Sequence, residues 1–444
     1  MSSFDIIEQK MRRAGIAGAA IDAFRHSVQV LQSGAQMMIP ESEIQPAEGV
    51  MDWEEAVSGT APADADLLRQ MVVIKLNGGL GTSMGLQKAK SLLEIKPGIT
   101  FLDTIIRQVR SLRQAAACPV RLLLMNSFST SADTLAHLQR YADEGFGKAE
   151  QVEMMQNRVP KLLADTLAPA EWPAAPELEW CPPGHGDLYA ALVGSGRLEE
   201  LLAAGVKYAF ISNSDNLGAQ PDTRFLRCFA ESGAPFVMEV TRRTEADRKG
   251  GHLATRRTDG QLLLRETAQC LPEDAEAFRD IEKHRYFNTN NLWLRLDALK
   301  DYLDEHGGVM PLPVIRNEKT VDPRDASSPR VYQLETAMGA AIQCFPGARA
   351  VCVPRSRFFP VKTCSDLLLL RSDAVEIDES GCMQLAPECG GVAPVVLLDT
   401  KLYKQVDSLE SLGVPGLKHC RRLVVRGPHR FTPGEPLKGE VEIG

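Results

Sequence analysis

A glycine-rich loop that follows a strand-like run is the part of this sequence whose residues best suit a phosphate site. The run at 71–77 is apolar and rich in β-branched residues, and the loop after it has glycines at 78, 79, 81 and 85 before it reaches Lys90. Because glycine permits positive φ angles and has no Cβ, such a loop can bring backbone N–H groups against the phosphates of a nucleotide. It lacks the GKS or GKT ending of a P-loop and the GxGxxG spacing of a dinucleotide fold, so taken alone it is equally compatible with a tight connection.

The elements that must position this loop alternate along the chain. Apolar runs typical of strands lie at 72–76, 120–127, 208–212 and 236–240, and helical stretches lie at 101–115 and 130–143. This alternation predicts an α/β fold with a central mixed, mainly parallel sheet that has helices on both faces, in the Rossmann-like manner. Ligands of such folds sit beyond the carboxyl ends of the strands.

The two ends of the chain differ from this middle part. Apolar residues at helical spacing predict one or two helices before residue 35, and the acidic stretch 40–66, rich in Ala and Pro, predicts a connector. In the last sixty residues Gly and Pro recur between short β-branched pieces, which suits short strands and turns. We therefore expect a helical N-terminal segment with its linker at 1–70, a catalytic domain at 71–385 and a short β-rich domain at 386–444.

Composition excludes several classes of function. The formal net charge of the 444 residues is −8, which argues against bulk nucleic-acid binding and requires any polyanionic ligand to meet a local basic cluster. No apolar run approaches the length of a membrane helix, and the N-terminal residues are charged where a signal peptide needs its apolar core, so we expect a cytoplasmic protein. The ten cysteines contain no CxxC pair and predict reduced thiols; only Cys364 lies near a candidate catalytic residue.

The glycine loop is one of seven motifs that together resemble a known family. LNGGLGTSMG with its following lysine resembles the signature loop of the UDP-glucose pyrophosphorylases of the eukaryotic type, also called UTP:glucose-1-phosphate uridylyltransferases. The other motifs follow in the family's order: PPGHGDLY at 182–189, NSDNLGA at 213–219, MEVTRRTEADRKGG at 238–251, FNTNNLW at 287–293, QLETAMGAAI at 333–342 and VPRSRFFPVKTCSDLLLLRSD at 353–373. The resemblance is strong over residues 70–375, although Ala89 stands where the family commonly has proline.

The resemblance implies a nucleotidyltransferase that uses Mg²⁺ to join UTP and glucose-1-phosphate, releasing UDP-glucose and pyrophosphate. It implies that Lys90 and Lys362 form a cationic clamp on the phosphates, that His185 contacts both phosphates, and that Asp215 holds the metal, since Mg²⁺ prefers oxygen ligands and takes few protein carboxylates. The implied nucleotide-binding residues are Leu76, Asn77, Gly78, Gly79, Gln156, Gly184 and Ser214. The implied sugar-phosphate residues are His185, Asn213, Gly251, Glu266 and Asn290.

Other functions remain open at this point. A pyrophosphorylase for galactose-1-phosphate or N-acetylglucosamine-1-phosphate would share most of these motifs. A non-catalytic nucleotide-sugar sensor would gain little from two lysines and a metal carboxylate that serve a transition state. A dehydrogenase is disfavoured by the absence of GxGxxG. The family resemblance also suggests a left-handed β-helix at the C-terminus, but about one turn of it is present, so we expect a monomer or a small homo-oligomer.

Overall fold

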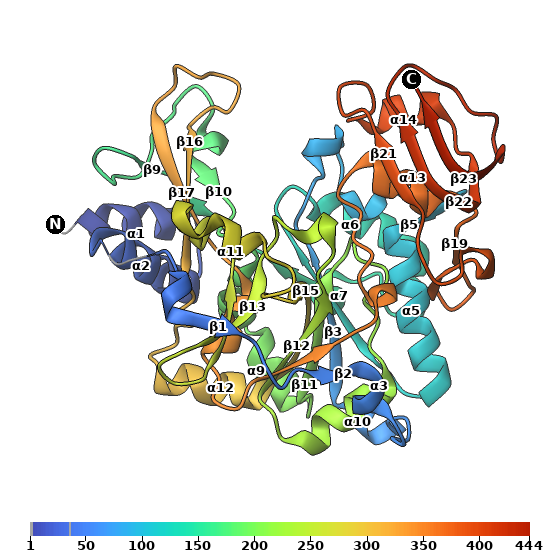
Figure 1. The fold of residues 1–444 in the computed structure, drawn as a ribbon. Helices are drawn as coiled ribbons and strands as arrows, with labels where there is room; N and C mark the ends of the chain where they lie inside the picture. The colour runs from blue at the N-terminus through green and yellow to red at the C-terminus, as the bar shows by residue number, and fades with distance from the viewer. Residues whose placement is uncertain (1–2, 35–36) are drawn as a thin grey trace.

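A mixed β-sheet forms the centre of the molecule in the computed structural model, which describes residues 3–34 and 37–444. Its main path runs in the order β2-β18-β12-β15-β11-β3-β6-β7, and β13 joins β1, β14 and β15 beside it (Figure 1). Along the main path neighbouring strands are parallel except where β15 pairs with β11 and β12. The pairings of β13 with β1, β14 and β15 are antiparallel. The strands of this sheet are β1 (Ile44–Pro46), β2 (Met51–Asp52), β3 (Met71–Asn77), β6 (Arg121–Asn126), β7 (Glu153–Met155), β11 (Tyr208–Asn213), β12 (Phe236–Arg242), β13 (His252–Arg256), β14 (Leu262–Arg265), β15 (Tyr286–Arg295) and β18 (Arg349–Cys352).

Helices cover both faces of the sheet, as the alternating sequence pattern predicted. Along β3, Val73 packs into one apolar cluster with α5, α10 and α13, while Val72 and Ile74 pack into the other with α8, α9 and α12. This division follows from the strand geometry, in which successive side chains point to opposite faces. The helices are α3 (Trp53–Val57), α4 (Ala65–Arg69), α5 (Phe101–Ala116), α6 (Ser131–Leu138), α7 (Ala149–Val152), α8 (Leu188–Gly194), α9 (Arg197–Ala203), α10 (Thr223–Ser232), α11 (Ala275–Arg279), α12 (Leu296–Glu305), α13 (Cys364–Arg371) and α14 (Val406–Leu412).

The stretch expected to be a connector is more ordered than its composition indicated. Residues 40–66 contain β1, β2 and α3, and β1 pairs with β13 while β2 pairs with β18 of the central sheet. The expectation of a plain linker was wrong because strands of two or three residues are too short to show an apolar period. The two helices predicted before residue 35 are present as α1 (Ser3–Arg13) and α2 (Gly18–Gln32).

Two smaller units flank the central sheet (Figure 1). On one side α1 and α2 pack against β8 (Val159–Pro160), β10 (Trp180–Cys181) and the sheet of β9 (Leu162–Leu163), β16 (Val314–Thr320) and β17 (Arg330–Thr336). On the other side lie β21 (Val395–Leu398), β22 (Gly416–Val425) and β23 (Pro436–Ile443), which pair in parallel. Short antiparallel pairs are formed by β4 (Glu94–Lys96) with β5 (Ile99–Thr100) and by β19 (Val375–Ile377) with β20 (Met383–Leu385). The three parallel strands agree with a β-rich C-terminal part, and its β-helical form stays a prediction.

All ten cysteines are free, and Cys364 is buried, with burial raising its pKa to about 11. Its Sγ donates to the Lys404 carbonyl at 3.3 Å, so it behaves as a packing residue. Across residues 3–34 and 37–444, we find no helix that combines the length and the apolar character needed to cross a membrane.

Candidate active site

Four parallel strands end side by side at one edge of the sheet, and the candidate nucleotide residues follow those ends. The register pairs Met155 of β7 with Asn126 of β6, Asn126 with Asn77 of β3, and Leu76 with Asn213 of β11. Gln156, the glycine loop and Asp215 therefore leave the sheet in neighbouring positions. This is the carboxyl edge, where ligands of parallel α/β sheets bind.

The residues implied for uracil recognition come together around Gln156. Its Nε2 donates to the Gly184 carbonyl at 3.0 Å, and a Cβ on Gly78 would lie 2.5 Å from its Oε1. Gly184 has a φ of +80°, and a Cβ there would lie 2.5 Å from the Thr336 carbonyl oxygen, so both conformation and space require glycine. An amide held between two bare backbone segments is suited to pairing with the donor and acceptor of a base edge.

His185 follows Gly184 in a short 3₁₀ turn and has a defined tautomer. The backbone N–H of Met338 donates to its Nδ1 at 3.0 Å, and burial lowers the pKa of His185 to about 4. The ring is therefore neutral at pH 7, and because Nδ1 accepts a hydrogen bond, Nε2 carries the proton. His185 is prepared to donate one hydrogen bond to an anionic oxygen without bringing a full charge.

Lys90 and Asp215 form an ion pair at the strand ends. The Lys90 Nζ lies 2.7 Å from Asp215 Oδ2, and the same ammonium donates to the carbonyl of Val361. The backbone N–H of Lys90 donates to the Gly79 carbonyl at 3.1 Å, so the end of the glycine loop folds back on its start. Ala89 has a φ of −50°, which is within the range that proline would impose at this position.

The loop after β11 is bonded to a segment from much later in the chain, residues 355–362, which we call the closing segment. The Phe359 N–H donates to Asn216 Oδ1 at 2.9 Å, and the Val361 N–H donates to the Asp215 carbonyl at 3.2 Å. A Cβ on Gly218 would collide with the Ser356 carbonyl, so the two backbones approach closely. These contacts bring Lys362, the residue after Val361, next to the loop that carries Asp215.

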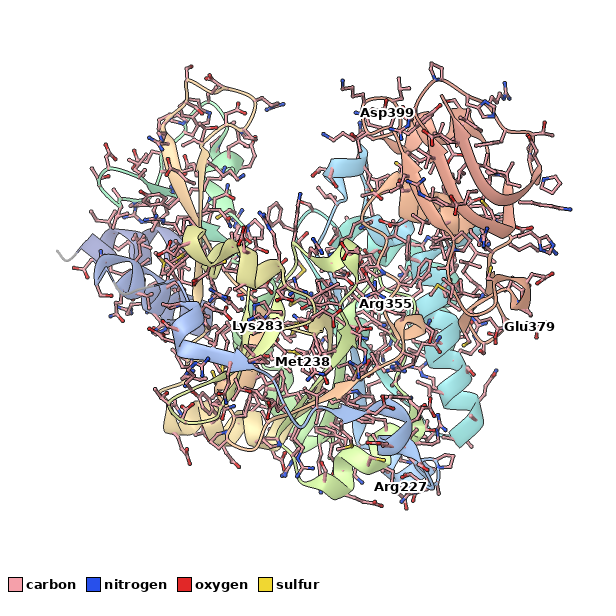
Figure 2. All side chains as sticks on the ribbon, viewed as in Figure 1. Arg227, Met238, Lys283, Arg355, Glu379 and Asp399 are labelled. Atoms are coloured by element: carbon pink, nitrogen blue, oxygen red, sulfur yellow. The ribbon has the colours of Figure 1, made fainter. Side chains whose placement is uncertain are left out.

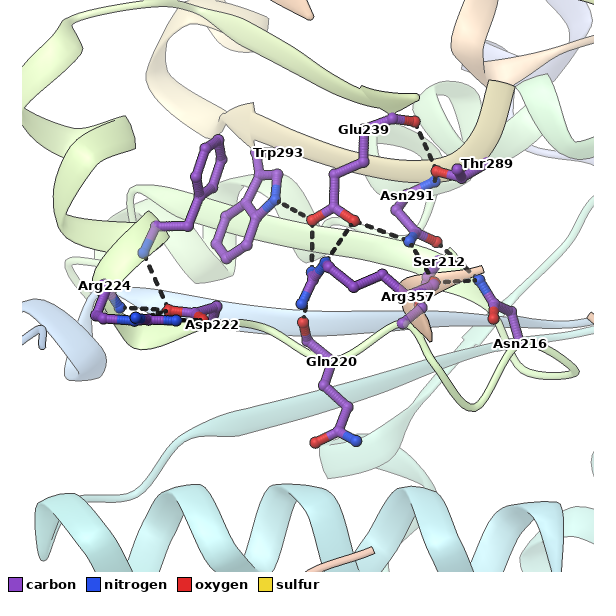
Figure 3. Close-up of polar contacts among 12 residues, drawn as sticks. Ser212, Asn216, Gln220, Asp222, Arg224, Glu239, Thr289, Asn291, Trp293 and Arg357 are labelled. Atoms are coloured by element: carbon purple, nitrogen blue, oxygen red, sulfur yellow. Dashed lines mark hydrogen bonds and ion pairs between the residues drawn. The ribbon is translucent and has the colours of Figure 1, made fainter. Parts of the chain in front are cut away.

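A buried ion pair anchors the closing segment to the sheet (Figure 3). The Glu239 carboxylate is fully buried and receives Arg357 Nη2 at 2.6 Å and Nε at 3.0 Å. Trp293 Nε1 and Asn291 Nδ2 donate to the same carboxylate, each at 2.9 Å. The Arg357 carbonyl in turn accepts from Asn216 Nδ2 at 3.2 Å. The bidentate geometry fixes the direction of the guanidinium and with it the course of the closing segment.

A second buried basic side chain, that of Lys75, supports the Asp215 loop from within the sheet. Lys75 of β3 is almost completely buried, and its Nζ donates to Ser212 Oγ at 2.8 Å and to the Ala219 carbonyl at 2.7 Å. Burial lowers the pKa of Lys75 to about 7. The lysine therefore ties the last residue of NSDNLGA to the strand that precedes the loop.

Two of the candidate sugar residues, Gly251 and Glu266, lie against each other. A Cβ on Gly251 would lie 2.5 Å from Glu266 Oε2, so the carboxylate rests against a bare backbone. Burial raises the pKa of Glu266, and the nearby Lys362 ammonium lowers it in part. Lys362 is exposed and lines a cavity of about 870 Å³ together with Lys249, Gly250 and Phe287. The Lys362 ammonium is therefore near enough to the Glu266 carboxylate to affect its pKa.

Asn290 is held in an unusual backbone conformation on β15. Its φ is +58°, and the pairing of β12 with β15 shifts register between Glu239 and Val240, opposite this position. Asn288 and Asn290 hold each other through hydrogen bonds of 2.9 Å, from Asn288 Nδ2 to Asn290 Oδ1 and from the Asn290 N–H to Asn288 Oδ1. A bulge of this kind re-aims a side chain at the edge of a functional site.

The remaining candidates lie along the same edge, and the side chains of Leu76, Asn77 and Ser214 are buried. Asn77 donates from Nδ2 to Asn126 and to Thr134, so its amide braces the strand ends. Leu76 is buried and its carbonyl accepts from the Ser214 N–H at 3.1 Å. Asn213 ends β11. The nucleotide and sugar contacts implied for these residues stay predictions.

The donor set near Asp215 fits magnesium better than a metal that needs a protein cage. Within the part of the chain that the structure describes, no group of three or more His, Cys, Asp or Glu side chains could hold a metal ion. Mg²⁺ does not need one, because it usually takes one or two carboxylates and fills its octahedron with phosphate oxygens and water. Asp215, partly exposed at the carboxyl edge, supplies such a carboxylate.

Comparison with known proteins agrees with this geometry. A family model described as UTP--glucose-1-phosphate uridylyltransferase matches residues 21–438. The chain belongs to this family. The UTP--glucose-1-phosphate uridylyltransferase of Saccharomyces cerevisiae is 43% identical over 388 residues, which is 86% of this chain and 75% of the yeast protein.

Solved structures from the uridylyltransferase family resemble the whole chain. A mutant UDP-glucose pyrophosphorylase from Leishmania major in complex with UDP-glucose is similar with a TM-score of 0.94 and 48% identity, covering 100% of this chain and 94% of that one. A UDP-glucose phosphorylase from Trypanosoma brucei is similar with a TM-score of 0.90 and 46% identity, covering 100% and 95%. The mixed α/β architecture is therefore that of the family.

Sequence reasoning missed the residues that hold the uridylyltransferase site in shape. Glu239 and Arg357 both lie inside family motifs, and Lys75 lies in the strand before the glycine loop. An acidic residue in an apolar run such as FVMEV, and a lysine in VVIKL, are signals of buried charge, since lone charges rarely occupy such positions. Their partners were not visible, because a pairing across more than a hundred residues leaves no local pattern.

Proposed function

We propose that this protein transfers the uridylyl group of UTP to glucose-1-phosphate, giving UDP-glucose and pyrophosphate. One observation carries the proposal. The hydrogen-bonded joint between the Asp215 loop and the closing segment unites Asp215, Lys90 and the residue before Lys362 in one group. A carboxylate for a divalent cation beside two lysines is what a reaction between two phosphate anions requires. Membership of the uridylyltransferase family supports the same reaction.

The proposed chemistry is a direct displacement. A phosphate oxygen of glucose-1-phosphate attacks the α-phosphorus of UTP in line, and the bond from that phosphorus to the bridging oxygen breaks, so that its electron pair leaves with pyrophosphate. No covalent enzyme intermediate is needed. The barrier lies in bringing two anions together, so positioning and charge neutralisation carry the rate.

Each side chain has one proposed task. Asp215 would hold Mg²⁺, which when bound neutralises charge on the phosphate oxygens. Lys90 and Lys362 neutralise negative charge on the phosphates, and the Nε2–H of His185 donates a hydrogen bond to a phosphate oxygen. Gln156 with Gly78 and Gly184 reads uracil, helped by Leu76, Asn77, Gly79 and Ser214 along the same edge. Asn213, Gly251, Glu266 and Asn290 meet the sugar phosphate.

The proposal is tested by measuring pyrophosphate release from UTP with a panel of sugar-1-phosphates, in the presence and absence of Mg²⁺. We expect release with glucose-1-phosphate and magnesium, and much slower release with galactose-1-phosphate or N-acetylglucosamine-1-phosphate. A preference for one of these other sugars would assign the protein to a related pyrophosphorylase. Binding of UDP-glucose without any release would identify a nucleotide-sugar sensor.

Assembly and location are further expectations. We propose a monomer or a small homo-oligomer, because the C-terminal sheet consists of three parallel strands, too few to stack end to end in a large assembly. Light scattering at micromolar concentration measures this directly, and a stable octamer held through residues 423–444 would contradict it. The cytoplasmic location expected from the N-terminal sequence stays a prediction.

A further inference from the structure

The β13–β14 hairpin carries two candidate sugar residues at its open end. His252 pairs with Arg265 in the register, so Gly251 and Glu266 are the next residues on each strand. The Glu266 N–H donates to Gln269 Oε1 at 2.8 Å, which fixes the turn that follows β14. The position of the Glu266 carboxylate therefore depends on how this end of the hairpin is held.

Arg265 anchors the hairpin to a distant part of the chain. Its side chain is fully buried, with Nη1 2.7 Å from Glu41 Oε2 and Nη2 2.9 Å from Asp274 Oδ2. The Glu41 N–H also donates to Asp274 Oδ2, at 2.7 Å. A buried guanidinium requires such partners, because an unpaired charge away from water costs several kcal/mol, by an order-of-magnitude measure.

Glu41 lies on a segment that follows the hairpin over its length, residues 39–46, which we call the N-terminal strap. The Ile39 N–H donates to the Gln269 carbonyl at 2.8 Å, and the Arg257 N–H donates to the Glu43 carbonyl at 2.9 Å. Directly after the second contact, β1 pairs with β13. The strap therefore holds the sugar hairpin through backbone hydrogen bonds, and its Glu41 side chain adds the ion pair with Arg265.

The second oxygen of Glu41 is also occupied. Glu41 Oε1 lies 2.8 Å from His284 Nε2 and 2.7 Å from the Nζ of Lys283, which Figure 2 labels beside the strap. His284 stacks on His252 with ring centroids 3.9 Å apart. Burial would raise the pKa of Glu41, but the hydrogen bonds from Lys283 and His284 outweigh it and hold the pKa below its usual value. Glu41 is therefore ionised at neutral pH and joins three elements through one carboxylate.

From these contacts we infer that Glu41 is a positioning residue for sugar recognition, which it controls by holding Arg265 and thereby the Glu266 carboxylate. The inference rests on the proposed function, in which Glu266 meets the glucose hydroxyls. The candidate uridine residues Leu76, Asn77, Gln156 and Ser214 lie on or just after β3, β7 and β11. In the described part of the chain, no hydrogen bond or ion pair joins them to Glu41 or Arg265. Loss of Glu41 should therefore affect one substrate and not the other.

The test compares Glu41→Gln with Glu43→Gln in the full-length protein. The two variants make the same chemical change two residues apart, but Glu43 is exposed. For Glu41→Gln we expect KM for glucose-1-phosphate to rise about tenfold, the scale of a weakened hydroxyl contact, with KM for UTP within about twofold of the wild type. Discrimination against galactose-1-phosphate should narrow, and Glu43→Gln should match the wild type.

Glu266→Gln separates failure of this inference from failure of the proposed function. If Glu266→Gln leaves KM for glucose-1-phosphate unchanged, the proposed sugar site is wrong. If Glu266→Gln raises that KM and Glu41→Gln behaves like Glu43→Gln, the positioning role is overturned. A Glu41→Gln protein whose two KM values rise together would show a general structural role and would overturn it as well.

If Glu41→Gln does not fold, Lys283→Met provides the second measurement. This change removes the most exposed partner of Glu41 and leaves Arg265 paired. We expect KM for glucose-1-phosphate to rise by about twofold to threefold while KM for UTP stays constant. This is the size of effect expected from loss of a partly exposed ion pair. Equal values for wild type and variant would overturn the inference.

Discussion

The Lys90 ammonium lies 2.7 Å from the carboxylate of Asp215, so a lysine already neutralises the side chain proposed to hold magnesium. A metal ion that approaches Asp215 must compete with this ammonium for the same oxygens. Its arrival would free Lys90 to turn toward the phosphates. If Asp215 holds the metal as proposed, binding of the metal would be coupled to release of Lys90, because each charge would have a partner in both arrangements.

Asp215→Asn tests the metal carboxylate. Asparagine keeps the shape and most hydrogen bonds but removes the charge, so we expect a higher Mg²⁺ requirement and a turnover lower by about two orders of magnitude. The measurement is a Mg²⁺ titration of pyrophosphate release, with a thermal melt to verify folding. Asp143→Asn, at an exposed position, serves as the control. An unchanged titration curve in Asp215→Asn would direct the search to another carboxylate.

Lys362→Ala tests the exposed half of the clamp. If its ammonium neutralises charge that grows in the transition state, kcat should fall by about two or more orders of magnitude, the scale of lost electrostatic stabilisers. KM should change little, because the effect belongs to the transition state. Lys401→Ala removes an exposed lysine of the C-terminal region and should leave kcat unchanged. Near wild-type turnover in Lys362→Ala would remove this residue from the mechanism.

Arg357→Lys tests the anchor of the closing segment. Lysine keeps the charge beside Glu239 but cannot make the two parallel hydrogen bonds of 2.6 and 3.0 Å. We expect a loss of about 1–3 kcal/mol in the free energy of unfolding and a roughly tenfold lower kcat, since Lys362 and Asp215 would be less well aligned. Denaturant unfolding and steady-state kinetics measure the two effects. Arg349→Lys, exposed on β18, should show neither.

Asp187 makes the stability of the protein depend on pH. Burial raises the pKa of Asp187 to about 7, against the lowering effect of hydrogen bonds from Asn157. The folded state then holds a proton that the unfolded state releases above its own pKa near 3.8, so this group destabilises the fold increasingly as pH rises from about 4 to 7. The Tm of Asp187→Asn minus that of the wild type should therefore increase between pH 4 and pH 8. A Tm difference that stays constant from pH 4 to pH 8 would contradict the raised pKa of Asp187.

Local patterns in the sequence were sufficient to predict the main strands of the central sheet and the helix after the glycine loop. The apolar runs at 72–76, 120–127, 208–212 and 236–240 became β3, β6, β11 and β12, and the helical stretch at 101–115 became α5. They succeeded because buried parallel strands and amphipathic helices have periods that a sequence shows directly. Each family motif is a contiguous run of residues, so the motifs could be recognised in the sequence and indicated the reaction.

The residues that hold the site in place could not be predicted from the sequence. Glu239 and Arg357, like Glu41 and Arg265, are paired across the fold, and nothing near either residue indicates its partner. The short strands β1 and β2 were missed because their pairing, and not their composition, makes them strands. The sequence therefore indicated candidate groups for the chemistry, whose roles stay predictions, and the structure shows what holds them in place.

The joint between the Asp215 loop and the closing segment also bears on how the protein is made. Every residue that contacts Asn216 and the Asp215 carbonyl through this joint is synthesised long after the glycine loop. Strand β2 likewise waits for β18, the strand with which it pairs. A nascent chain that has emerged from the ribosome only as far as β12 has its phosphate loop but neither the anchor nor Lys362. The Asp215 loop, its anchor and Lys362 can therefore come together only after residues 355–362 have been synthesised.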